Sequence, residues 1–250
     1  MLPAQACGLL LSCFMRLALF TALSASFALG QSPIPQSVLE RYLLATHDGP
    51  GAGLGETVGV EIEASLPRLQ KHGAMRGLRM ITRAGETVYT GLRFSGDRII
   101  GKDVISRYLA ADVERRSDKK EFAIAAGNYR IERAGVADYN GHVAQVFRVI
   151  PKHKRVGLFR GELWLDAATA LPLREWGEFV KSPTAFLSHP RFVRDYSIVE
   201  GKSRPRRLIL TARAALVGDV EMTVWFSDDA CGESAGDGFP GADLVAASNP

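Results

Sequence analysis

The sequence is poor in cysteine, and that shortage limits how the chain can be stabilised. Only three cysteines occur in 250 residues, and Cys7 and Cys13 lie within the first thirty. Removal of that segment would leave Cys231 alone, so no internal disulfide could form. The remaining chain, about 220 residues, is long enough to fold by core packing. With 46% hydrophobic and 23% charged residues, we expect one globular domain.

The sequence also lacks the patterns that mark catalytic and metal sites. The five histidines (His47, His72, His142, His153 and His189) have no second histidine or cysteine at metal-ligand spacing. There is no G-x-S-x-G or H-E-x-x-H motif and no calcium-loop spacing of acids. We therefore predict a non-enzymatic protein without catalytic residues, metal or cofactor. A hydrolase whose serine, histidine and acid come from distant positions is the alternative.

The first thirty residues contain no acid and one basic residue, Arg16. An apolar or small run, LALFTALSASFAL, follows, and small residues precede Gln31. This order is typical of a secretory signal, so we predict a signal peptide at residues 1–30 and export to the periplasm. The run is shorter than the ~20 residues of a membrane span. A membrane anchor, or a lipid-attachment box ending at Cys13, is the alternative.

Most of the chain consists of segments that alternate apolar and polar residues. In ETVGVEIEASL, residues 56–66, every second residue is apolar and points to one face of the expected strand. Glu61 and Glu63 both point to the opposite, solvent-exposed face. Paired acids on a wet strand face are expected to be solvated rather than catalytic. Further strands are expected at 77–83, 87–94, 129–133, 142–150, 207–215 and 220–227, and as two strand pairs in GELWLDAATALPLREWGEF and FVRDYSIVEGKSRPRRLIL.

Two segments have helical spacing instead, namely 35–46, with Ser37 as the cap, and 102–116. Short turns between about ten strands, including the Asn140-Gly141 signal, favour antiparallel pairing. Such a sheet should curl into a barrel, partial barrel or sandwich, with the helices on its apolar face. Residues 229–250 have few apolar side chains and are expected to be a disordered tail, which leaves 31–228 as the folded domain.

The net charge of +4 is mildly basic. Basic residues cluster only at Lys152–Arg155 and Arg204–Arg207, both expected in turns, where they are either solvated or in contact with anionic lipid headgroups. Trp164 and Trp176 fall on the mixed sides of their strands, as surface residues or as a membrane or partner contact. Nucleic-acid binding is not expected, because exposed aromatics are not interleaved with these clusters.

The string LFRGELWLDAATALPLREWGEFVKSP, followed by FVRDYSIVEGKSRPRRL, resembles the LolA-like superfamily of bacterial envelope proteins. The resemblance lies in LWLD, a turn, PLR and the later DY..VEG...P, with KDVISRYL as an upstream helix, and covers roughly residues 56–228. It implies a mainly β (α+β) fold, in which a curved antiparallel sheet forms an incomplete β-barrel. A helical lid would then cover an apolar cavity for acyl chains. Lipoprotein carriers, envelope-stress sensors and glycolipid-binding proteins share that fold.

We therefore predict a periplasmic protein that binds lipid acyl chains or lipoproteins and carries them across the envelope. The alternative is an envelope sensor or scaffold that binds a membrane protein partner. The candidate ligand-binding residues are the apolar side chains on one side of each strand. Some of them must form ordinary core under the helices. They are Val60, Ile62, Phe147, Val149, Leu163, Leu165, Phe179, Met222 and Val224.

Overall fold

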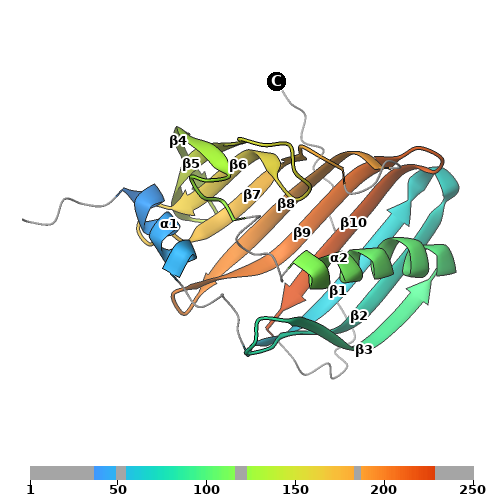
Figure 1. Ribbon diagram of the computed structural model, residues 1–250. Helices are drawn as coiled ribbons and strands as arrows, with labels where there is room; N and C mark the ends of the chain where they lie inside the picture. The colour runs from blue at the N-terminus through green and yellow to red at the C-terminus, as the bar shows by residue number, and fades with distance from the viewer. Residues whose placement is uncertain (1–36, 49–54, 116–122, 183–186, 229–250) are drawn as a thin grey trace, which may run out of the picture. The chain divides into compact units, whose positions relative to one another are not determined.

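A computed structural model describes residues 37–48, 55–115, 123–182 and 187–228. The predicted signal peptide and tail, with all three cysteines, lie outside the described residues. The strands form one antiparallel sheet in the order β3-β2-β1-β10-β9-β8-β7-β6-β5-β4 (Figure 1). Their bounds are β1 (Thr57–Leu66), β2 (Lys71–Ile81), β3 (Thr87–Gly96), β4 (Tyr129–Tyr139), β5 (His142–Pro151), β6 (Phe159–Asp166), β7 (Pro172–Phe179), β8 (Leu187–Val199), β9 (Lys202–Ala214) and β10 (Gly218–Ser227).

The sheet is open, with β3 and β4 as its two edges. Among the described strands these two edges do not pair with each other. Figure 1 shows the sheet twisting and bending about the face that carries α1 (Val38–Asp48) and α2 (Ser106–Arg115). The predicted fold class, a curved antiparallel sheet that forms an incomplete barrel with helices on one face, is therefore confirmed.

One face of the sheet, here called the inner face, holds the core. Its residues follow the predicted alternation: Ile62 lies opposite Met75 of β2 and Val224 of β10, and Val224 lies opposite Leu208 of β9. Ile62, Met75 and Val224 have no exposed surface. Hydrophobic burial on this face, worth about 25 cal/mol per Å² of apolar area, is the main source of stability.

Helix α1 begins with a capping box. The Glu40 amide donates to Ser37 Oγ at 3.2 Å, and the Ser37 amide donates to the Glu40 carboxylate at 2.8 Å. Val38 and Tyr42 are buried in the core beneath the helix. Arg41 holds the helix to the β6–β7 turn by donating to the carbonyl oxygens of residues 167 and 168 at 3.1 and 2.8 Å. The predicted helix and its Ser37 cap are confirmed.

The second helix differs from the prediction at its start. The chain first forms a π-helical turn, η2 (Ile100–Ile105), and α2 follows. In a π-helix residues five apart share a face, so Ile100 and Ile105 both point to the sheet, and both are fully buried. Gly73 of β2 makes room for this contact, because a Cβ there would lie 2.8 Å from the Ile100 side chain.

The predicted turn at Asn140-Gly141 forms, and the β8–β9 hairpin turns in the same way at Glu200-Gly201. Asn140 and Gly141 have φ of 49° and 81°, and Glu200 and Gly201 have φ of 51° and 71°. Positive φ at both central residues gives the type I′ turn that suits a twisted hairpin.

The basic cluster Arg204–Arg207 does not lie in a turn as predicted, because β9 already begins at Lys202. The chain turns earlier, at Glu200-Gly201, where both residues have positive φ. A register shift between Asp195 and Tyr196 accommodates Pro205, which lacks an amide hydrogen for the sheet.

No helix among the described residues is both long enough and apolar enough to cross a membrane.

The facing glycines Gly161 and Gly177 give a test of packing on the inner face. They lie opposite each other in β6 and β7, and a Cβ at Gly161 would overlap the backbone of Trp176 and Gly177. We expect Gly161→Ala to lower the free energy of unfolding by about 1–3 kcal/mol because the two strands must separate. Gly135→Ala is the control, since nothing lies within 4 Å of its added Cβ. Equal unfolding midpoints in urea for both variants would contradict this account.

Candidate functional site

The nine predicted ligand-binding residues all lie on the inner face. Eight of them belong to one continuous buried cluster, and Phe179 packs against it. Ile62, Val149, Leu163, Leu165 and Val224 have no exposed surface at all. The structure thus brings together residues from β1, β5, β6, β7 and β10 that are up to 164 positions apart in the sequence. Their contact with a ligand stays a prediction.

Two helices cover opposite flanks of this face. The main contacts of α1 with the sheet are to β6, whereas those of η2 and α2 are to β1, β2 and β3. Strands β8 and β9 lie between these flanks in the sheet order, and their main contacts are with neighbouring strands. Their inner residues include Phe192 and Leu208, which are buried, and Leu210, which is partly buried. The strip between the helices is the candidate site.

A polar cluster interrupts the apolar strip. Arg194 Nη1 of β8 donates to the Glu175 carboxylate of β7 at 3.0 Å and lies 3.5 Å from the Tyr196 hydroxyl. The Arg194 guanidinium also lies over the Phe192 ring, 5.7 Å from its centroid. The side chains of Arg194 and Glu175 are only 20% and 10% exposed. A charged pair is therefore held among the apolar residues of the strip.

The protonation of this cluster follows from its surroundings. Burial, and secondarily the Glu175 charge, raises the pKa of the Tyr42 and Tyr196 hydroxyls above the usual value. Burial alone would lower the pKa of Arg194, but Tyr196 and Glu175 outweigh it and raise that pKa. The cluster therefore presents neutral hydroxyl groups and a permanent cation, which can hydrogen-bond the polar end of an amphiphile.

Sequence reasoning missed this cluster, although the signal was present. Phe192, Arg194 and Tyr196 alternate along β8, so all three must share a face. A basic residue among the apolar residues on one side of a strand indicates a buried charge that needs a partner. Which residue provides the partner depends on the register of β7 against β8, where Glu175 lies opposite Arg194.

A second polar contact holds α2 to the sheet. The Asp112 carboxylate accepts hydrogen bonds from Arg79 Nε of β2 at 3.0 Å and from the Tyr89 hydroxyl of β3 at 2.9 Å. The Arg79 side chain is 9% exposed and that of Asp112 is 19% exposed. Burial raises the pKa of Tyr89, with the Asp112 charge as the next contribution. We call these three residues the α2 latch.

Two histidines lie beside acids, as the hydrolase alternative requires. His142 Nδ1 is 2.9 Å from Asp166, and His189 Nδ1 is 3.1 Å from Glu178. The hydrogen bonds found for these histidines in the described part of the chain do not include a serine hydroxyl. Asp166 instead accepts the amide and hydroxyl of Thr169 and shapes the β6–β7 turn. Among the described residues no three potential ligands gather around a metal position.

The side of the sheet opposite the inner face, here called the outer face, carries Trp164 and Trp176. The indole nitrogens of Trp164 and Trp176 both donate to Glu162, at 2.9 and 3.0 Å. Trp176 is 42% exposed, and Trp164 packs edge-on against Tyr139, with 5.8 Å between ring centroids. Both lie on the side of the sheet opposite the candidate site, and Trp176 is available for contact with a partner.

Comparisons with known proteins give structural similarities only. No family model matches the chain, and no curated protein matches its sequence. A LolA superfamily protein from Nitrosomonas europaea is similar over 74% of this chain and 90% of that chain, with 13% identity and a TM-score of 0.38. An outer membrane lipoprotein-sorting protein domain from Vibrio parahaemolyticus is similar over 75% and 89%, with 15% identity and a TM-score of 0.40.

The MucA/MucB complex of Pseudomonas aeruginosa contains a further similar chain. The similarity extends over 76% of this chain and 92% of that chain, with 12% identity and a TM-score of 0.26.

The Arg194–Glu175 pair gives a test of the polar cluster. Arg194→Met should destabilise the protein by about 3 kcal/mol, because it leaves the Glu175 carboxylate buried without its partner. Glu175→Leu combined with Arg194→Met should recover at least half of that loss. Urea unfolding measures both, and Arg130→Met, in the exposed pair with Glu132, is the control, with an expected change below about 1 kcal/mol. A double variant as unstable as the single one would contradict the assignment.

Proposed function

We propose that the protein is a non-enzymatic periplasmic carrier that binds acyl chains of lipids or lipoproteins on the inner face of its sheet. The strip between α1 and α2 is the binding site. Phe192, Leu208 and Leu210 of β8 and β9 form its floor, and the nine apolar residues predicted from the sequence lie on the strands to either side and form its walls. Binding at one membrane and release at another would carry such chains across the envelope.

The observation that carries this proposal is the way in which the helices are attached. Both cover apolar residues, yet both are also held by a few polar contacts: Arg41 to the β6–β7 turn, and Asp112 to Arg79 and Tyr89. Each helix is thus held by a small number of directional, charge-assisted hydrogen bonds in addition to its apolar burial, and movement of the helix requires those few contacts to break. Helices attached in this manner can move aside and expose the apolar face to a ligand.

The energetics of acyl binding suit such a face. Burial of one methylene group contributes about 0.8 kcal/mol, so a chain of ~14 methylenes gains ~11 kcal/mol before the costs of ordering. Those costs lower the net affinity, but a useful one remains without any hydrogen bond to the chain. The Arg194 cluster would add a polar contact for the head of the ligand, with Tyr42 of α1 close to it.

The rim residue Phe179 gives a test of acyl binding. Its ring lies 5.0 Å from that of Phe192, and it is only partly buried. We expect the wild-type protein to bind a fluorescent fatty acid with saturation at one site, and Phe179→Ala to weaken that binding about fivefold through lost apolar contact. Val143→Ala, at an exposed position, should leave the affinity unchanged. No saturable uptake by the wild type, together with no lipid on the purified protein in native mass spectrometry, would contradict the proposal.

The α2 latch gives a second test. Asp112→Asn removes the charge that holds the buried Arg79, so docking of α2 should weaken by about 2 kcal/mol. Amide hydrogens of α2 should then exchange about thirtyfold faster, and fatty acid should enter faster. Asp103→Asn is the matched control, because the ion pair of Asp103 within the described residues is with the exposed Arg107, at 3.6 Å. Equal exchange rates in both variants would show that the latch does not control the helix.

A second candidate function is a sensor or scaffold that binds an envelope protein through the outer face. The exposed Trp176, oriented by Glu162, favours it. Binding of a membrane protein that is lost in Trp176→Ala but retained in Phe179→Ala would favour this role over acyl transport.

A further inference from the structure

Because the strands are antiparallel, successive turns lie alternately at the two ends of the sheet. Each strand reverses the chain, so alternate turns fall at the same end of the sheet. The turns at one end, here called the first end, lie at 66–71, 96–99, 151–158, 180–182, 187–190 and 214–218. Those at the opposite end lie at 55–56, 82–86, 139–142, 166–171, 199–202 and 227–228.

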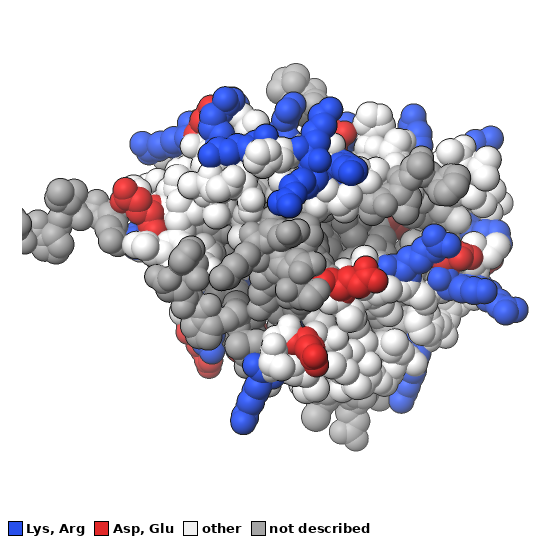
Figure 2. All heavy atoms as spheres, in the orientation of Figure 1, with Lys and Arg blue, Asp and Glu red and all other residues white. Residues whose placement is uncertain are grey.

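The two ends differ in charge. The first end carries seven basic residues and one acid: Arg68, Lys71, Arg98, Lys152, Lys154, Arg155, Lys181 and Asp97. The opposite end carries two basic residues and five acids: Arg83, Lys202, Glu56, Glu86, Asp166, Glu200 and Asp228. The one acid of the first end, Asp97, pairs with Lys71 at 2.7 Å. In the view of Figure 2, Lys and Arg side chains are numerous along the upper margin, and others lie at the right and lower sides.

The first end also carries exposed apolar side chains at the tips of its turns. Leu69, Ile99, Val156 and Leu216 are 42%, 45%, 42% and 86% exposed. In the described turns of the opposite end, no large hydrophobic side chain is exposed to this degree. The turns that carry Ile99, Leu69 and Leu216 follow one another along the sheet order, and the turn that carries Val156 lies further along it, beyond β8 and β7. Apolar tips separated by basic residues are the pattern of surfaces that enter the boundary of an anionic membrane.

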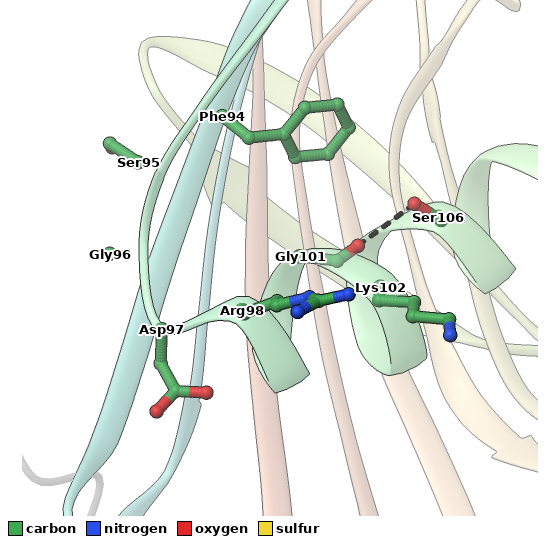
Figure 3. A pocket seen from close by; sticks show the side chains of 8 residues that line it. All are labelled: Phe94, Ser95, Gly96, Asp97, Arg98, Gly101, Lys102 and Ser106. Atoms are coloured by element: carbon green, nitrogen blue, oxygen red, sulfur yellow. Dashed lines mark hydrogen bonds between the residues drawn. The ribbon is translucent and has the colours of Figure 1, made fainter.

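A pocket of about 280 Å³ lies at the same end (Figure 3). It is formed between the last residues of β3 and the start of η2, with the Phe94 ring over η2 and with Arg98 and Lys102 among its lining residues. Phe94 is 47% exposed. The Asp97 carboxylate accepts hydrogen bonds from Lys71 and from the Ile99 amide, which lower its pKa. Its negative charge is therefore matched by Lys71, and the exposed cations Arg98 and Lys102 remain for an anionic group.

We propose that the first end of the sheet docks on an anionic phospholipid membrane. The basic residues contact lipid phosphates, and Leu69, Ile99, Val156 and Leu216 enter the headgroup region. A flat protein partner fits this end less well, because the apolar residues stand singly on separate turns instead of forming one patch. Docking in this manner places the first end of the inner face toward the bilayer. The proposal does not depend on acyl binding, although it would give an acyl chain a short path.

Vesicle co-sedimentation tests the proposal with protein purified from the envelope of the cells that produce it. The wild type should bind vesicles of phosphatidylglycerol and phosphatidylcholine, and binding should fall with rising salt. Lys154→Gln with Lys181→Gln should weaken binding about 25-fold, since each basic side chain near an anionic surface contributes about fivefold. Arg83→Gln with Lys202→Gln makes the same change of net charge at the opposite end and should weaken binding less than threefold.

The apolar tips are tested in the same assay. Leu216→Gln should weaken binding about tenfold, because a leucine side chain no longer enters the headgroup region, whereas Val136→Gln, on exposed β4, should not. Equal losses in the two charge pairs, equal binding to pure phosphatidylcholine, or no vesicle binding by the wild type would overturn the proposal. A protein that binds vesicles through the first end yet takes up no fatty acid would leave docking intact and would contradict acyl binding alone.

Discussion

The structure depends on the burial of one large apolar face. Ten strands in a single sheet place every second side chain on that face, and the described elements that cover it are α1, η2 and α2. Burial at about 25 cal/mol per Å² forces the sheet to bend and the helices to dock. Because the helices lie over opposite flanks, strands β8 and β9 form a strip between them. The candidate site is thus a consequence of the fold itself.

Polar contacts add to the attachment of helices α1 and α2 to the sheet. Asp112 with Arg79 and Tyr89, and Arg41 with the β6–β7 turn, hold the two helices through hydrogen bonds at the margins of the core. Arg194 and Glu175 lie on the inner face itself. A buried ion pair adds little net stability, since removal of two charges from water costs as much as their attraction returns. In the proposed function, this pair would offer hydrogen-bonding groups to the polar end of a ligand.

Much of the fold could be predicted from the sequence, because alternation and turn chemistry are local signals. The file of Val60 and Ile62, the Asn140-Gly141 turn and the Ser37 cap all appear where the residues indicate. The π-helical turn that begins at Ile100 could not be predicted from the sequence. The Ile100 side chain packs against Gly73, which lies 27 positions earlier in the chain. The Arg194–Glu175 pair depends on strand register, which alternation alone leaves undetermined. The basic end became visible only when the strand order placed separate turns side by side.

The central claim is that the inner face between the two helices holds an acyl chain. Photo-crosslinking with a diazirine-labelled fatty acid, followed by peptide mapping, tests it most directly because it identifies the residues in contact with the chain. The account predicts labelling of inner-face residues such as Phe179, Phe192 and Leu210, suppressed by excess unlabelled fatty acid. Labelling confined to outer-face residues around Trp176, or labelling that excess fatty acid does not suppress, would contradict it.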